Sequence, residues 1–108
     1  MSDVWITDIR HYLGQDLSII ELTDSAARLR DFLGSIIGTV TLRNPEEIDY
    51  VTEIKCRRRP GHRRCEGNIV AYFGEEDPSA IKWYCTFCDD SGYIRGWQGT
   101  VWDKTKSR

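Results

Sequence analysis

The sequence lacks most of the patterns that would assign it to a functional class. No apolar run approaches the roughly 18 to 20 residues that a transmembrane helix requires. The first residues do not form a basic segment followed by an apolar stretch, as a secretory signal would. A phosphate-binding loop, a nucleophile elbow and a paired His-Glu motif are all missing, and His11 has no evident catalytic partner. We therefore expect a cytoplasmic protein that does not associate with membranes and for which no catalytic residue can be named.

The chain does contain enough apolar side chain for one small core. It has 108 residues, of which 40% are hydrophobic, with four Trp, five Tyr and three Phe. This size predicts a single domain over residues 1–108, close to the size at which a metal ion adds noticeably to stability. Within it we expect a helical part over 1–47, a metal-pinned β part over 48–103, and a frayed tail over 104–108.

One amphipathic helix is predicted in the N-terminal part. Apolar residues between positions 29 and 40 recur at steps that keep them on one helical face. Thr23, or one of the two residues after it, can cap the first turn. We predict a helix over 24–38 that ends at Gly38, and its apolar stripe is core. The segment 4–13 has mixed spacing, which leaves helix and strand both open.

The second half of the chain alternates apolar and polar residues, as half-buried strands do. The predicted strands are 50–56, 65–73, 81–85 and 93–97. One helix followed by an antiparallel meander is an α+β arrangement. We therefore predict an α+β fold in which the N-terminal helix packs on an antiparallel sheet, with the end of the sheet clamped by a metal ion.

The pair Cys85 and Cys88 forms a C-x2-C motif. At this spacing a turn directs both sulfurs toward one metal ion. The same motif serves thiol redox chemistry, where it usually opens a helix that lowers the pKa of the attacking thiol. Here two aspartates, a serine and a glycine follow, which is an electronegative turn composition. The composition favours metal ligands over a redox pair.

Cys56 and Cys65 complete a set of four, although eight residues separate them. If Pro60 and Gly61 are the central residues of a hairpin turn, Cys56 lies directly opposite Cys65, with the Cβ atoms about 4.5 to 5.5 Å apart. Two residues separate His62 from Cys65, the spacing of a metal-ligand pair, so His62 is a rival ligand. In this register, however, His62 points to the other face of the hairpin. A Cys56–Cys65 disulfide would need oxidation and would leave the other pair unexplained. We predict one structural Zn²⁺ bound by Cys56, Cys65, Cys85 and Cys88.

Two cysteine pairs set in strand-forming sequence resemble the zinc-ribbon plan, in which two hairpins hold one Zn²⁺. The first pair departs from that plan because its spacing is not C-x2-C. The run from Trp83 to Asp103 is also similar to a group of small bacterial proteins without an assigned activity. That resemblance implies a bacterial cytoplasmic origin and adds nothing on mechanism.

The net charge of −2 conceals a strongly basic segment over 55–64, which carries six Lys and Arg residues and no acidic one. Arginines near the sulfurs have a structural reason, because a four-thiolate zinc centre carries a formal charge of −2. In the predicted hairpin Arg57, Arg59 and Arg64 fall on the opposite face, and they are the candidate partner-binding residues. Arginine presents a planar fork to phosphate oxygens, yet nucleic-acid binders usually carry a broad basic surface.

These observations predict a binding or adaptor module with a structural zinc and a protein partner. Nucleic-acid binding through the segment 55–64 is the alternative. A thiol-redox or hydrolytic enzyme ranks third, because four cysteines close the coordination sphere and leave no site for substrate. Tyr93, Trp97 and Trp102 are expected to wrap around the zinc lobe and supply its core.

Overall fold

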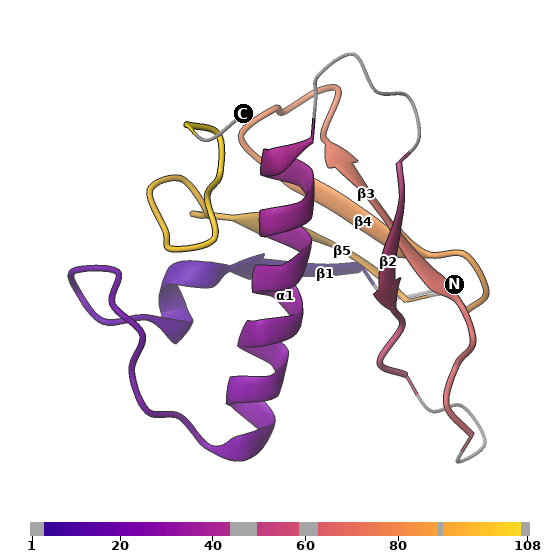
Figure 1. Cartoon of the computed structure of the whole chain (residues 1–108), viewed down its shortest axis with the longest axis horizontal. Helices are drawn as coiled ribbons and strands as arrows, with labels where there is room; N and C mark the ends of the chain where they lie inside the picture. Colours follow the sequence, from indigo (N-terminus) through magenta and orange to yellow (C-terminus); the bar gives the residue numbers. More distant parts are fainter. Residues whose placement is uncertain (1–3, 44–49, 59–62, 89, 107–108) are drawn as a thin grey trace.

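The computed structural model describes residues 4–43, 50–58, 63–88 and 90–106. It has two layers, a five-stranded sheet and one long helix that lies across one face of the sheet (Figure 1). The elements in chain order are β1 (Val4–Asp8), η1 (Ile9–Tyr12), α1 (Asp24–Leu42), β2 (Val51–Lys55), β3 (Asn68–Phe73), β4 (Ile81–Cys85) and β5 (Ser91–Arg95). The predicted α+β class is confirmed.

The sheet is mixed, with strand order β1-β5-β4-β3-β2. Strands β2 to β5 form the expected antiparallel meander, but β1 pairs with β5 in parallel. The predicted antiparallel meander is therefore present, and β1 adds a parallel strand at its edge that the prediction did not include. The segment 4–13 combines a strand with a 3₁₀ turn, so neither a helical nor a strand periodicity extends over its whole length. Asp8 joins the two by accepting a hydrogen bond from the Arg10 N–H.

Helix α1 begins where predicted and continues past its predicted end. The Thr23 hydroxyl oxygen accepts a hydrogen bond from the Ala26 N–H and caps the first turn. The helix then runs through Gly38 to Leu42. A glycine ends a helix when it adopts a left-handed conformation, and among the described glycines only Gly96 and Gly99 have positive φ.

The hydrocarbon core lies between α1 and the sheet. The helix contributes Leu33, Ile36, Ile37 and Val40, and the strands contribute Ile69, Ile81 and Ile94. The Phe32 ring meets the Trp83 ring edge-on, with centroids 5.6 Å apart. Burying side chains of this size stabilises the fold by about 1.5–3 kcal/mol each.

The C-terminal aromatics do not wrap the cysteines. The Trp97 indole N–H donates to the Ser79 carbonyl, 2.9 Å away, just before β4 begins, whereas Cys85 is the last residue of β4. Because β5 runs antiparallel to β4, it carries the chain away from the cysteines, and Trp102 packs against Gly34 of α1. The expected zinc-lobe core is wrong for these two residues.

The segment after Trp102 is attached to the helix. The Lys104 N–H donates to the Thr41 hydroxyl at 2.9 Å. Among the described residues, no helix combines the length and apolar character needed to cross a membrane.

Candidate metal centre

The four cysteines come together at one end of the sheet. Cys56 directly follows β2, Cys65 precedes β3, and Cys85 and Cys88 lie at the end of β4 and in the turn after it. Their sulfur atoms all lie within 4.8 Å of one another. The Cys56 and Cys88 sulfurs are 3.7 Å apart, and those of Cys65 and Cys85 are 3.6 Å apart. The cluster could hold a metal ion.

Each close sulfur pair joins one cysteine of the β2–β3 connection to one of the β4–β5 connection. A disulfide within the β2–β3 connection, between Cys56 and Cys65, is not formed, since all four thiols are free. A bound ion would therefore fasten two separate connections to each other. Cys56, Cys65 and Cys85 are buried and Cys88 is half-buried.

The predicted register between Cys56 and Cys65 is wrong by two residues. Val51 lies opposite Val70, as that register requires, but further along Lys55 lies opposite Asn68. Accordingly, the Cys56 N–H donates to the Gly67 carbonyl at 2.9 Å, and the Cys65 N–H donates to the Arg58 carbonyl at 2.8 Å.

An irregularity in β2 accounts for this displacement, since the four residue steps from Val51 to Lys55 lie opposite only two steps of β3. Within it the Thr52 hydroxyl donates to the Ile69 carbonyl at 2.7 Å and accepts from the Ile54 N–H at 3.1 Å. Side chains alternate with a period of two, so a shift by two residues leaves each cysteine on its expected face. The predicted turn at Pro60 and Gly61 and the rival ligand His62 lie outside the described residues.

Backbone N–H groups point at the sulfurs. Phe87 and Cys88 donate to the Cys85 sulfur at 3.3 and 3.5 Å, and Gly67 donates to the Cys65 sulfur at 3.5 Å. Such bonds favour the thiolate over the thiol, and the thiolate is the form that binds metal. The turn after β4 therefore has the donor geometry expected of a C-x2-C metal ligand pair.

The thiols differ in acidity because their surroundings differ. Burial raises the pKa of Cys56 and of Cys88. Burial acts in the same direction on Cys85, but the N–H groups of Cys88 and Phe87 outweigh it and lower its pKa. Metal ions bind the thiolate form, so loading a metal ion would displace the protons that these thiols carry.

Two residues that the sequence patterns did not single out lie against Cys85. A Cβ atom on Gly67 would lie 2.3 Å from the Cys85 sulfur, so this position accepts no side chain without rearrangement. Asp90 accepts the Cys85 N–H through its carbonyl at 2.9 Å. For Gly67, its position two residues after Cys65 is the only sequence signal that could have indicated such close packing. For Asp90 there is no such signal, because its sequence context is that of an ordinary turn.

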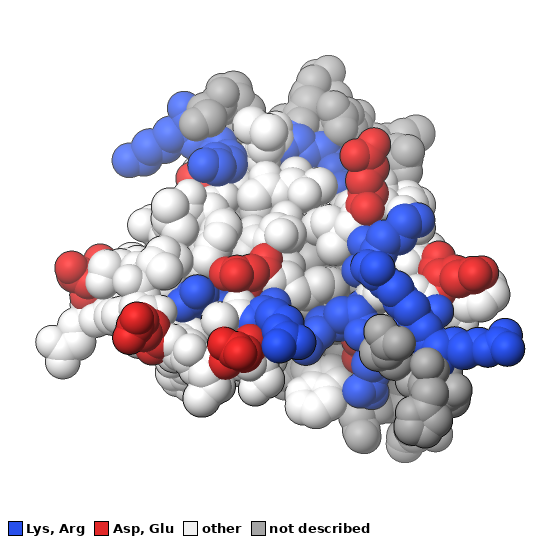
Figure 2. Space-filling view, turned by 60° about the horizontal axis from the view of Figure 1, so that its bottom comes forward, with Lys and Arg blue, Asp and Glu red and all other residues white. Residues whose placement is uncertain are grey.

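The described residues of the basic segment lie beside the cysteine cluster. Arg57, Arg58, Arg63 and Arg64 are exposed, and Figure 2 shows a gathering of Lys and Arg side chains on one side of the molecule. Arg58 forms an ion pair with Asp90, 3.6 Å from Nε to Oδ1. Arg57 lies over the Phe32 ring, 5.8 Å from its centroid. Arg59 is not among the described residues.

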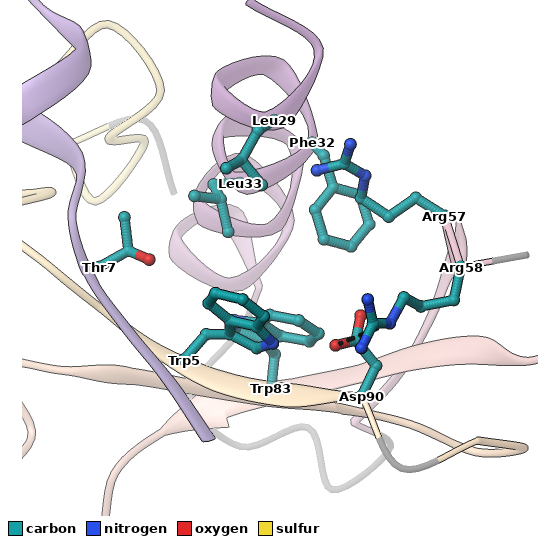
Figure 3. A pocket seen from close by; sticks show the side chains of 9 residues that line it. All are labelled: Trp5, Thr7, Leu29, Phe32, Leu33, Arg57, Arg58, Trp83 and Asp90. Carbon is teal, nitrogen blue, oxygen red and sulfur yellow. Dashed lines mark ion pairs between the residues drawn. The ribbon is translucent and has the colours of Figure 1, made fainter. Parts of the chain in front are cut away.

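Asp90 is the buried charge of this region, with a side chain 6% exposed. Burial raises its pKa, while the guanidinium groups of Arg58 and Arg57 act in the opposite direction. A pocket of about 370 Å³ opens next to this ion pair (Figure 3). Its lining includes Trp5, Phe32 and Trp83 together with both arginines.

The fold and the site define an α+β protein with a four-cysteine cluster suited to a metal ion. No protein-family model matches the chain, and neither a curated protein nor a solved structure is significantly similar to it. The resemblances to zinc ribbons and to small bacterial proteins gain no support from these comparisons.

Proposed function

We propose that the protein is a small binding module whose four cysteines hold one structural Zn²⁺. The observation that carries this proposal is the sulfur geometry. A Zn–S bond of about 2.3 Å in a tetrahedron places neighbouring sulfurs roughly 3.8 Å apart, close to the 3.6 and 3.7 Å separations here. Tetrahedral four-sulfur sites suit zinc or iron, and a reducing cytoplasm would keep these thiols free to bind either.

A structural role follows from the number of ligands. Four thiolates complete the coordination sphere and leave no open position for water or substrate. The ion would instead join the β2–β3 and β4–β5 connections, as zinc does in the zinc-ribbon plan. Its contribution would be to fix these two segments relative to each other.

The surface that this ion would fix is basic, which indicates an anionic partner. Arg57 and Arg64 are exposed on the segment between Cys56 and Cys65, and the rest of the chain is acidic overall. A protein with an acidic surface is the first candidate partner. Nucleic acid is the second, and it is favoured by one specific feature, the aromatic pocket that lies directly beside Arg57 and Arg58.

Metal analysis tests the first part of this proposal. Reduced protein purified without added metal should contain one zinc per chain by native mass spectrometry and by elemental analysis. Protein that carries no metal after careful reduction, or one iron per chain with the corresponding colour, would contradict it.

A charge-matched pair of triple variants tests the second part. Replacing Arg57, Arg59 and Arg64 by Ser should leave zinc content and melting temperature unchanged and abolish binding to the anionic partner. Replacing Arg28, Lys104 and Lys106 by Ser removes the same net charge elsewhere and should leave binding intact. Equal loss of binding in both variants would show that only the net charge matters. Loss of zinc from the Arg57, Arg59 and Arg64 variant would show that these arginines have a structural role.

A further inference from the structure

The pocket beside the metal centre has an aromatic floor. Trp5 of β1 and Trp83 of β4 each lie opposite Gly92 of β5, so they flank a residue without a side chain. A Cβ atom on Gly92 would meet the Trp83 indole nitrogen at 2.9 Å. The glycine therefore lets the indole lie low on the sheet and keeps the hollow open. The helix supplies the facing wall, made of Leu29, Phe32 and Leu33 (Figure 3).

Trp5 is the feature that indicates a ligand. It is 53% exposed even though it lines a concave site. Pockets lined by apolar and aromatic side chains, with a few convergent polar groups, are the usual form of a small-ligand site. A half-exposed indole in such a pocket offers a flat face on which a planar ring can stack.

The polar groups at the rim are an acceptor and two donors. The Asp90 carboxylate accepts hydrogen bonds, and the Arg58 guanidinium beside it donates them. Arg58 keeps a side chain 55% exposed, so most of its donors remain available. Arg57 lies above Phe32 at the other side of the opening. With two cations and one anion the rim carries a charge of +1, which favours an anionic ligand.

We infer that this pocket binds a nucleobase together with its phosphate group. The planar ring would stack on Trp5, the edge of the ring would face Asp90 and Arg58, and the phosphate would meet Arg57. An adjacent carboxylate and guanidinium match an edge with neighbouring donors and an acceptor, which is the Watson–Crick edge of guanine. This inference rests on the proposed binding module and develops its second candidate partner, nucleic acid, into a ligand for this pocket.

The metal centre would position both sides of the rim. Arg57 and Arg58 follow Cys56 directly, and Asp90 lies two residues after Cys88. A bound ion fixes these two segments relative to each other, so it would also fix the separation of Arg58 and Asp90. Ligand binding should therefore require the metal-loaded protein.

Direct titration tests the inference. Zinc-loaded protein is titrated with guanosine monophosphate, adenosine monophosphate and ribose 5-phosphate at roughly 50 mM salt, with tryptophan fluorescence and calorimetry as readouts. We expect guanosine monophosphate to bind best and ribose 5-phosphate, which lacks a base, not to bind. A single-stranded hexanucleotide containing guanine distinguishes the two sources of the base. Much tighter binding than the mononucleotide indicates a nucleic-acid strand, and equal binding indicates a free nucleotide.

Two variants and one control assign the binding to this pocket. Trp5→Leu should weaken binding about tenfold or more, since stacking on one aromatic ring contributes that much. Arg57→Gln should weaken binding and, for the hexanucleotide, reduce the dependence of log affinity on log salt by up to about one unit. Tyr84→Leu removes an exposed ring that points to the opposite face of the sheet from Trp83, and it should bind like the unmodified protein.

Several outcomes would overturn the inference and leave the binding module intact. One is ribose 5-phosphate binding as well as the nucleotides, and another is no binding of any nucleotide or of the hexanucleotide. Unchanged binding by Trp5→Leu with full zinc content would also overturn it. If an acidic peptide binds instead, and Arg57→Gln abolishes that binding, the partner is a protein. Absence of zinc from the unmodified protein would contradict the proposed function itself, and metal analysis detects this separately.

Discussion

The two ends of the sheet differ in what fills the space next to them. Near the middle of α1 the core is hydrocarbon, with Ile36, Ile37 and Ile81 fully buried. At the end of β4 the buried groups include Cys56, Cys65 and Cys85, of which Cys56 and Cys65 lie just outside the strands β2 and β3. Burial of apolar side chains alone can stabilise the hydrocarbon region, whereas the stability of the sulfur region depends on what links the four thiols to one another.

The largest effect should follow from removing one sulfur ligand. Cys65→Ser should lose most of its metal and unfold at a clearly lower temperature, because apparent zinc-binding energies of about 10–16 kcal/mol are coupled to folding in small zinc domains. Single Ser variants at Cys56, Cys85 and Cys88 should behave alike. Elemental analysis and thermal unfolding measure both effects.

His62→Ala is the control for this ligand set. It should retain the metal and the melting temperature, because four sulfurs already complete the site. If the histidine variant releases metal while one of the cysteine variants does not, the ligand set is wrong.

Removing the metal without mutation should separate the two regions. After chelation under reducing conditions, amide hydrogen exchange should become fast at Cys56, Cys65, Gly67 and residues 86–88, whose N–H groups bond to a cysteine sulfur or to a carbonyl of the segments next to the cysteines. Amides in α1 and in the centre of β4 should stay protected, because hydrocarbon burial holds them. Equal loss of protection in both regions would mean that the metal stabilises the whole fold as one unit.

A smaller effect should come from overpacking the hydrocarbon region. A Cβ atom at Gly34 would lie 2.3 Å from the Trp102 ring, so Gly34→Ala should reduce the free energy of unfolding by about 1–3 kcal/mol. The nearest atom to a Cβ at Gly38 is the Trp102 carbonyl oxygen at 3.7 Å, an ordinary contact. Gly38→Ala should therefore stabilise the helix by about 0.5–1 kcal/mol.

Denaturant unfolding of the zinc-loaded proteins measures this pair of variants. Both should retain full metal content, because neither position lies near the sulfurs. Equal effects at Gly34 and Gly38 would show that Trp102 does not pack against the helix as described.

The sequence predicted what depends on local periodicity and on thiol chemistry. The apolar stripe of α1 and the C-x2-C turn are both formed by short segments, and each was recognised from its own residues. The convergence of four cysteines followed from chemistry, since few arrangements satisfy four thiols in one small domain. The four cysteines converge although the predicted register is wrong, because the irregularity in β2 shifts the strand by two residues and keeps each cysteine on the same face of the sheet.

Features that depend on distant contacts were not predictable in this way. Gly38 stays helical because it lies inside a packed helix, and no local signal distinguishes it from a glycine that ends one. The parallel pairing of β1 with β5 joins residues far apart in the chain. The ion pair of Arg58 with Asp90 likewise requires that two connections meet, which only the fold determines.

The smallest effect should come from one hydroxyl that attaches the C-terminal segment to α1. Thr41 is fully buried, donates to the Ile37 carbonyl at 2.7 Å and accepts from the Lys104 N–H at 2.9 Å. Thr41→Val keeps the shape and leaves the Lys104 N–H without this acceptor, so it should cost about 1 kcal/mol. Ser35 makes a similar bond to the Asp31 carbonyl at 2.9 Å, but on the exposed side of the helix. Ser35→Ala should therefore change stability by less than about 0.5 kcal/mol.

Denaturant unfolding and metal analysis together decide this last comparison. Both variants should keep one metal ion per chain, since the hydroxyls belong to the hydrocarbon region. Hydrogen exchange at Lys104 should rise in Thr41→Val and stay unchanged in Ser35→Ala. If Thr41→Val costs no more than Ser35→Ala, the C-terminal segment is held by the packing of Trp102 against Gly34, and the hydroxyl bond is secondary.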